Sequence, residues 1–245
     1  MIYEAALTDP NGVVLLTNTK GHRRTVCRGT LWKYKESSDS RGYVKRPPYH
    51  LHNAEEEILP IKTHFVPSLL AVNKQIHAEA INFLYNQKMI LADTASLFQL
   101  LATIGPRNQQ RLLGLELFDY GEGRLSKSRN HAAMTLLAGA TNLKPFTFRC
   151  SVKDYYGYGR KINKAVSIAR QIYRDAHHFL EAYGFANGRR DAAVDVIHLG
   201  EENFKRMGHG DSPSEHDELE GLIKSELRSL LNVPIGQKVG KARKG

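Results

Sequence analysis

The chain has 245 residues, and its hydrophobic content of 41% is enough for a sizeable core and excludes disorder along the whole length. No apolar run reaches the roughly 18 residues that cross a bilayer, and no apolar leader follows Met1, so we expect no membrane partner. The formal charge of +10 lies in two segments, since residues 20–46 carry +7 and the residues after Gln237 carry +4. Two cysteines, Cys27 and Cys150, are too few for a disulfide framework, and we expect an intracellular protein, cytoplasmic or nuclear.

These features predict a single α/β domain over residues 1–236, with a basic loop insertion at about residues 20–64 and a basic flexible tail over residues 237–245. At the start, Ile2–Thr8 is typical of the end of a helix, and Val13–Thr17 follows turn residues as a short strand. A second strand is expected within Cys27–Tyr34, followed by a polar loop that Gly and Pro interrupt.

The strongest local signal lies in residues 67–87. Six apolar residues recur at helical spacing and predict the buried face of a helix of about five turns: Leu69, Val72, Ile76, Ala80, Phe83 and Leu84. The same stretch holds polar residues that raise the question of an active site: Asn73, Lys74, Gln75, His77 and Glu79.

That polar cluster is better explained as part of a structural helix. His77 and Glu79 are two residues apart, so their side chains would point about 200° apart around the helix and could not act on one substrate atom. Gln75 and Glu79 are four apart and can interact with each other. Asn73 falls within the apolar stripe, where its amide would need hydrogen-bond partners.

Strands and helices alternate in the rest of the chain. Strands are expected over residues 89–92, 113–118 and 146–150, and helices over 95–104, 130–141, 162–183 and 215–231, with an apolar stretch at 193–199. This order predicts an α/β fold with parallel strands, either an irregular leucine-rich-like arc or a small open parallel sheet, with an N-terminal helix remnant. The Leu and Asn positions in "LLAGATNLKPFTFRC" favour the arc.

Two stretches resemble a known family. The segment "FVPSLLAVNKQIHAEAINFLYNQKMILADTASLFQLLATIGPRNQQRLLGLEL" resembles a large group of fungal F-box-like proteins with the pattern "LLxVCRQIxxEAxxxxY", followed by "IGP" and a short strand. The opening "MIYEAAL" resembles the end of their F-box-like helix, "LPxEIRNxIYEYAL". The matches cover residues 1–8 and 65–118, with Asn73 at the position of the family's Cys.

The resemblance implies a non-enzymatic intracellular protein-interaction module. It further implies a substrate-recognition component of a ubiquitin ligase, with a Skp1-like adaptor as its protein partner. The residues that match the family's docking helix would then bind that partner: Ile2, Tyr3, Ala6 and Leu7.

The basic segment offers an alternative function, nucleic-acid binding. Cations alternate there with aromatic residues, as phosphate contacts and base stacking would require: Arg23, Arg24, Arg28, Trp32, Lys33, Tyr34 and Lys35. The same composition is also typical of a solvated basic insertion.

Other reactive residues match no known chemical motif. The segment "GHGDSPSEHDE" holds four residues that could in principle bind a cation, His209, Asp211, His216 and Asp217, but their spacing fits no metal site. The segment "YYGYGRK" lacks a phosphate-binding pattern. We therefore expect no catalytic residues, no metal, no cofactor and no enzymatic activity.

Overall fold

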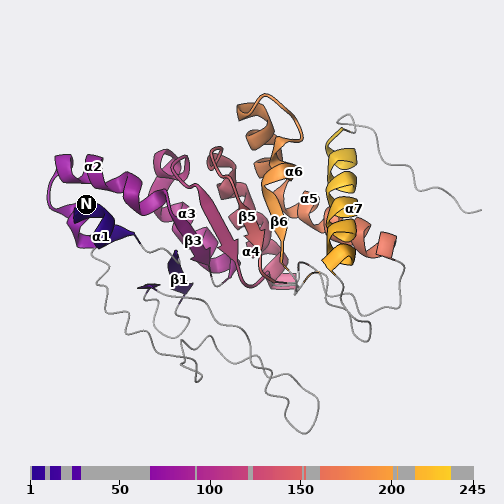
Figure 1. Cartoon of the computed structure of the whole chain (residues 1–245), viewed down its shortest axis with the longest axis horizontal. Coiled ribbons are helices and arrows are strands. Elements are labelled where there is room, and N and C mark those ends of the chain that lie inside the picture. Colours follow the sequence, from indigo (N-terminus) through magenta and orange to yellow (C-terminus); the bar gives the residue numbers. More distant parts are fainter. Residues whose placement is uncertain are drawn as a thin grey trace, which may run out of the picture.

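A computed structural model describes residues 2–8, 12–17, 24–28, 67–91, 93–120, 124–150, 152, 161–200, 203 and 213–232. They form a mixed α/β fold in which strands and helices alternate, as the sequence predicts (Figure 1). The strands are β1 Val13–Thr17, β2 Arg24–Arg28, β3 Lys88–Leu91, β4 Gly114–Leu117, β5 Phe146–Phe148 and β6 Ile197–Leu199. The helices are α1 Ile2–Leu7, α2 Lys74–Tyr85, α3 Thr94–Gln109, α4 Arg124–Leu136, α5 Lys161–Ala186, α6 Ala192–Val196 and α7 Pro213–Asn232, with short 3₁₀ helices η1 Pro67–Ala71 and η2 Leu137–Gly139.

The strands form one sheet in the order β2-β1-β3-β4-β5-β6. Strand β2 is antiparallel to β1, and each of the other neighbouring pairs is parallel. In Figure 1 the labelled strands β1, β3, β5 and β6 follow one another from left to right. Because the parallel strands keep their chain order, the sheet has no point where the order reverses, which a doubly wound sheet requires.

The core lies on one face of this sheet. The register aligns Met89, Leu115, Phe146 and Ile197 in one row, and a second row holds Leu91, Leu117, Phe148 and Leu199. Both rows belong to a single apolar cluster with residues from α2, α3, α4, α5, α6 and α7. The row between them, with Ile90, Glu116, Thr147 and His198, does not belong to that cluster. The helices therefore cover one face, as in the arc that the sequence favours.

The predicted helix over residues 67–87 is broken. A 3₁₀ turn, η1, ends at Ala71, and α2 begins only at Lys74, because the side chain of Asn73 caps it by accepting a hydrogen bond from the Ile76 N–H at 2.8 Å. The predicted buried face is correspondingly wrong in part, since Val72 is 62% exposed. Within α2 the buried residues are Ala80, Ile81 and Tyr85.

Several boundaries also differ from the prediction. Helix α3 runs to Gln109, but Gly105 interrupts it with a φ of 71°, a conformation that favours glycine, directly before Pro106. The apolar stretch at 193–199 divides into the end of α6 and strand β6. Strand β2 covers Arg24–Arg28 and overlaps the predicted strand at Cys27 and Arg28, so part of the predicted basic insertion is a strand of the sheet. Its remaining residues through 64 and the tail 237–245 lie outside the described residues.

Side-chain amides connect the loops that precede the strands. The Gln87 amide donates to the Leu7 carbonyl, the Asn142 amide donates to the Gln110 carbonyl at 2.8 Å, and the Asn187 amide donates to the Thr141 carbonyl at 3.1 Å. Each loop thus bonds to the backbone of the loop before it. The last carbonyls of a helix have no hydrogen-bond partner within that helix and need other donors when they are buried. These amides therefore stabilise the edge of the sheet where the strands begin.

The last helix is held by packing and by charge. Leu219, Ile223, Leu227 and Leu231 recur at helical spacing along α7 and are buried in the core. At the end of this helix, Arg228 pairs with Asp191 at 3.3 Å and with Asp195 at 2.7 Å, and Arg189 contacts the same two carboxylates. Within the described ranges, no helix is both long and apolar enough to cross a bilayer.

Two helical glycines give opposite predictions. A Cβ at Gly184 in α5 would lie 2.6 Å from the Arg190 carbonyl oxygen and 3.0 Å from the carbonyl carbon, both of which are backbone atoms. Gly184→Ala should therefore lower the free energy of unfolding by about 1–3 kcal/mol. A Cβ at Gly221 in α7 meets nothing within 4 Å, so Gly221→Ala should raise it by about 0.5–1 kcal/mol. Urea denaturation of both variants checks this, and equal effects would contradict the close approach at Gly184.

The corrected face of α2 gives a second prediction. Ile81 is buried among core residues, so Ile81→Ala should cost about 2–5 kcal/mol of unfolding free energy through cavity formation. Val72→Ala should change it by no more than about 0.5 kcal/mol, because this side chain is exposed. Thermal melts of the two variants compare them directly. A severe loss of stability in Val72→Ala would contradict the exposed position of Val72 and support the continuous apolar face predicted from the sequence.

Candidate functional site

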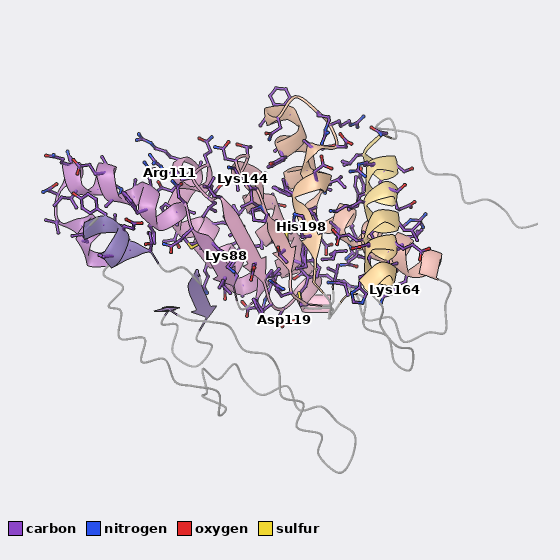
Figure 2. The ribbon with its side chains drawn as sticks, in the orientation of Figure 1. Lys88, Arg111, Asp119, Lys144, Lys164 and His198 are labelled. Carbon is purple, nitrogen blue, oxygen red and sulfur yellow. The ribbon has the colours of Figure 1, made fainter. Side chains whose placement is uncertain are left out.

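The face of the sheet opposite the core carries a group of polar and charged residues, which we call the open face. Side chains alternate along a strand, so residues next to the core rows point to the other side. The open face consists of Lys88 from β3, Glu116 from β4, Thr147 from β5 and His198 from β6, with Arg149 directly after β5. Figure 2 labels Lys88 at β3 and His198 at β6.

Glu116 is the centre of this group. Its residue is only 9% exposed, and its Oε1 lies 3.3 Å from Lys88 Nζ and 3.4 Å from Arg149 Nη2. The two cations belong to the strands on either side of β4 or to their ends, so the carboxylate joins three neighbouring segments. The Lys88 and Arg149 side chains are 41% and 47% exposed, so both can contact a partner molecule while they remain the counterions of Glu116.

His198 extends the open face toward α7. Its Nδ1 lies 3.9 Å from Glu220 Oε1, and the same carboxylate oxygen is 2.7 Å from Lys224 Nζ. Burial, and then the positive charge of Lys224, lower the pKa of His198 below its ordinary value of 6.5, and Glu220 opposes this shift. The imidazole is therefore held in its neutral form, in which it can both donate and accept a hydrogen bond.

The polar residues of the α2 segment have internal partners. Gln75 donates to Glu79 at 3.0 Å, Tyr3 donates to the other Glu79 oxygen at 2.9 Å, and the His77 ring contacts the Leu70 carbonyl at 3.0 Å. The Gln75 amide and the Tyr3 hydroxyl lower the pKa of Glu79. Asn73 is an exposed helix cap rather than a buried amide of the apolar stripe. The structure supports the structural explanation of this cluster.

Two of the four predicted partner-binding residues, Leu7 and Tyr3, make contacts within the protein. Leu7 has no exposed surface, and the Tyr3 ring lies 6.1 Å from the Phe83 ring. Ala6 is partly exposed, and Ile2 is the first residue of α1. In this arrangement the helix is docked on its neighbour, and Leu7 is not available to a partner.

Most of the predicted nucleic-acid segment lies outside the described residues. Arg24 and Arg28 are the ends of strand β2 at the edge of the sheet, while Arg23, Trp32, Lys33, Tyr34 and Lys35 are not described. Nucleic-acid binding therefore stays a prediction from the sequence.

Among the described residues, nothing supports a metal site at the four residues named from the sequence. His209 and Asp211 lie outside the described residues, whereas His216 and Asp217 belong to α7. His131 of α4 stacks on His177 of α5 with ring centroids 5.7 Å apart, but no group of His, Cys, Asp and Glu side chains in the described part of the chain could hold a metal ion. The "YYGYGRK" segment is not described before Lys161, the first residue of α5.

A second polar network is closed within the protein. Asp175 of α5 is 3% exposed and accepts hydrogen bonds from Tyr120 at 2.7 Å, Gln171 at 2.6 Å and Arg174 at 2.8 Å. Burial and the Asp175 carboxylate raise the pKa of Tyr120, so this phenol stays protonated. A buried carboxylate with all these donors joins the segment after β4 to α5 and is better suited to stability than to chemistry.

The polar residues within the predicted strands point to the open face, although they form no reactive cluster in the sequence. The strands "GLEL", "FTF" and "IHL" place a polar or charged residue between two apolar ones, whereas in "KMIL" the charged Lys88 stands first and the alternate residue, Ile90, is apolar and buried. That pattern is typical of a strand with one buried and one accessible face. Each strand contributes one such residue, so the group exists only once the strands are aligned.

Comparisons with known proteins do not identify this chain. No protein-family model matches it, no curated protein is similar to it, and no solved structure matches its fold.

The His198 environment predicts a pH effect. Since the pKa is lowered in the folded state, the unfolded chain binds a proton at His198 more readily, and the free energy of unfolding should fall as the pH drops below about 6.5. His198→Gln should remove this part of the pH dependence. As a control, NMR titration should show a higher pKa for His198 in Lys224→Met than in the parent protein, because this substitution removes a positive charge that lowers it. A pKa at or above 6.5 in the parent protein would contradict the assignment.

Proposed function

We propose that this chain is a non-enzymatic protein-interaction module and that the open face is its binding surface. The observation that carries this proposal is the arrangement of the sheet: the main apolar cluster lies on the helix side, and the other face carries Lys88, Thr147, Arg149 and His198 around Glu116, which is 9% exposed. Stacked strand-helix units of this kind commonly bind partners along the exposed strands.

The charges of the open face are suited to reversible recognition. Glu116 is paired with two cations that remain half exposed, so no charge there is left without a counterion in the free protein. A partner with acidic groups could contact the exposed parts of Lys88 and Arg149 while both keep their pairs with Glu116, because loss of both cations would leave a buried carboxylate without a counterion. Charged groups at such a surface contribute to the choice of partner more than to the affinity.

The size of the face limits the kind of contact. Strands β3 to β6 span about 14 Å at ordinary strand spacing, and four residues of a strand span about 13 Å. The face is then roughly 200 Å², well below the about 800 Å² per partner of a stable interface. A protein partner must therefore also contact the loops beside these strands, which connect the sheet to the helices.

A more specific proposal rests on the family resemblance. In it the module is the substrate-recognition component of a ubiquitin ligase, and α1 belongs to the element that binds a Skp1-like adaptor. The docking of α1 on α2 through Tyr3 and Glu79 would then connect the adaptor to the first unit of the stack. The open face would bind the substrate.

A neutral triple substitution tests the proposed binding surface. Lys88→Gln, Glu116→Gln and Arg149→Gln together remove the three charges without leaving a buried charge unpaired. We expect the full-length variant to lose a defined set of co-purifying proteins by about tenfold or more and to keep the cooperative melt of the parent. Lys127→Gln on α4 changes the net charge equally, away from the sheet, and should leave that set unchanged.

The other outcomes of the same experiment are equally informative. Recovery of an adaptor protein of the Skp1 type with the parent chain would support the ubiquitin-ligase form. An unchanged set of proteins in the triple variant would overturn the assignment of the open face. Co-purification that nuclease treatment abolishes would favour the nucleic-acid alternative.

A further inference from the structure

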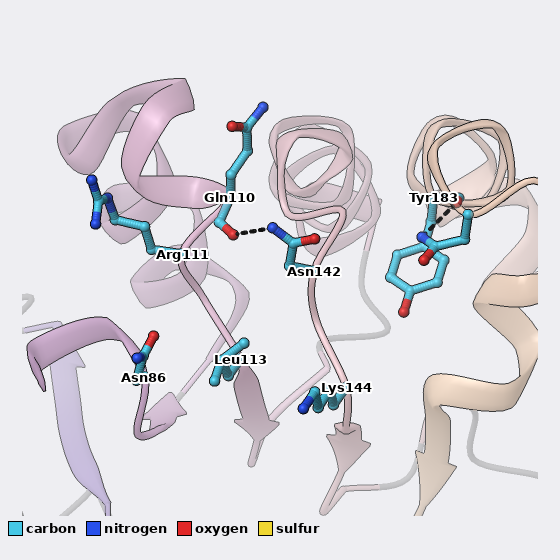
Figure 3. Close-up of a pocket in the computed structure, with 8 residues that line it drawn as sticks. Asn86, Gln110, Arg111, Leu113, Asn142, Lys144 and Tyr183 are labelled. Carbon is cyan, nitrogen blue, oxygen red and sulfur yellow. Dashed lines mark hydrogen bonds between the residues drawn. The ribbon is translucent and has the colours of Figure 1, made fainter. Parts of the chain in front are cut away.

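A pocket lies at the edge of the sheet where the strands begin, away from the open face. It has a volume of about 450 Å³ and lies among the loops that enter β3, β4 and β5 (Figure 3). Its lining consists of Asn86, Gln110, Arg111, Leu113, Asn142, Lys144, Tyr183 and Asn187. This volume is within the range of pockets that hold small molecules.

The lining has an unbalanced charge. It contains two cations, Arg111 and Lys144, four carboxamides and no carboxylate. Arg111 donates to the amide oxygen of Asn82, and none of the ion pairs among the described residues includes Arg111 or Lys144. By contrast, Lys88 and Arg149 on the open face share a carboxylate.

The walls of the pocket are fixed by hydrogen bonds that a ligand need not break. Tyr183 is buried and donates to the Leu143 carbonyl at 2.7 Å. Asn142 and Asn187 use their amide N–H groups for the loop-to-loop bonds described above. The side chain of Asn86 makes no such bond in the described structure, so its N–H groups remain to donate to a ligand, whereas the Gln110 carboxamide points away from Lys144 (Figure 3). Figure 3 shows Arg111 and Lys144 on neighbouring loops, with Leu113 between them.

We propose that this pocket binds a small molecule through an oxyanion, a phosphate or carboxylate group. Lys144 and Arg111 supply the positive charge, and Asn86 supplies a neutral donor. The Arg111 guanidinium is partly buried and has no carboxylate partner among the described residues. Its attraction to a bound anion is therefore stronger than that of a fully exposed cation, because its surroundings screen the charge less than bulk water does. No residue of the open face lines this pocket, so the proposal does not rest on the proposed protein-binding surface.

Titration of the full-length protein with inorganic phosphate, and separately with succinate, tests the proposal. Isothermal titration calorimetry at low ionic strength should show saturable binding of at least one of the two anions, and the arm that binds distinguishes phosphate from carboxylate chemistry. Lys144→Gln and Arg111→Gln should each weaken that binding by roughly tenfold, and Lys144→Arg should restore most of the loss at that position. Arg129→Gln removes one exposed cation from α4, outside the pocket, and should have no effect.

Three results would overturn the proposal. The first is the absence of saturable binding of either anion. The second is an equal loss in Arg129→Gln, which would indicate general attraction to a basic protein. The third is binding of a single-stranded oligonucleotide that depends on Lys144 and Arg111 while neither small anion binds, because the pocket would then belong to a nucleic-acid surface. Thermal melts of each variant establish that it is folded before titration.

Discussion

The packing of alternate strand residues against one layer of helices is the constraint on which the rest of the structure depends. Rows such as Met89, Leu115, Phe146 and Ile197 can be buried together only if the parallel strands keep their chain order and their connections stay on the same side. The intervening row points to the other side of the sheet, where Ile90 is 3% exposed and Glu116 is 9% exposed. Glu116 is tolerated there because it pairs with Lys88 and Arg149 across neighbouring strands.

The same arrangement explains why the edge with the pocket is rich in amides. Every unit ends a helix beside the start of a strand, and the carbonyls at these helix ends have no partner within their own helix. Asn and Gln can donate to a carbonyl of the preceding loop and still keep an oxygen free for another contact. An edge built in this way remains polar, and Arg111 and Lys144 add to it the two cations of the proposed anion site.

The sequence predicted the elements better than their boundaries. Helical spacing identified α5 and α7 almost completely, because long amphipathic segments give an unambiguous period. It failed at Asn73, where apolar spacing continued through a residue whose side chain caps the helix, and at Val196 and Ile197, where a helix and a strand share one apolar run. The open face could have been predicted residue by residue from strand alternation, but the pairing of Glu116 with Lys88 and Arg149 depends on the register between strands that are far apart in the sequence. No local pattern contains that information.

The contacts that hold α7 determine how this helix can unfold locally. This helix makes its main contacts with α5 and α6, while α1 contacts α2, so the two ends of the stack have no large contact in common. When each unit contacts mainly its neighbours, local unfolding of the last unit requires less free energy than global unfolding. That free energy depends on local contacts such as the ion pairs of Arg228. The central strands keep their neighbours during such an opening. The protein can therefore lose and regain its last helix while the charged residues of β3, β4 and β5 stay aligned, so that hydrogen exchange would vary gradually along the chain.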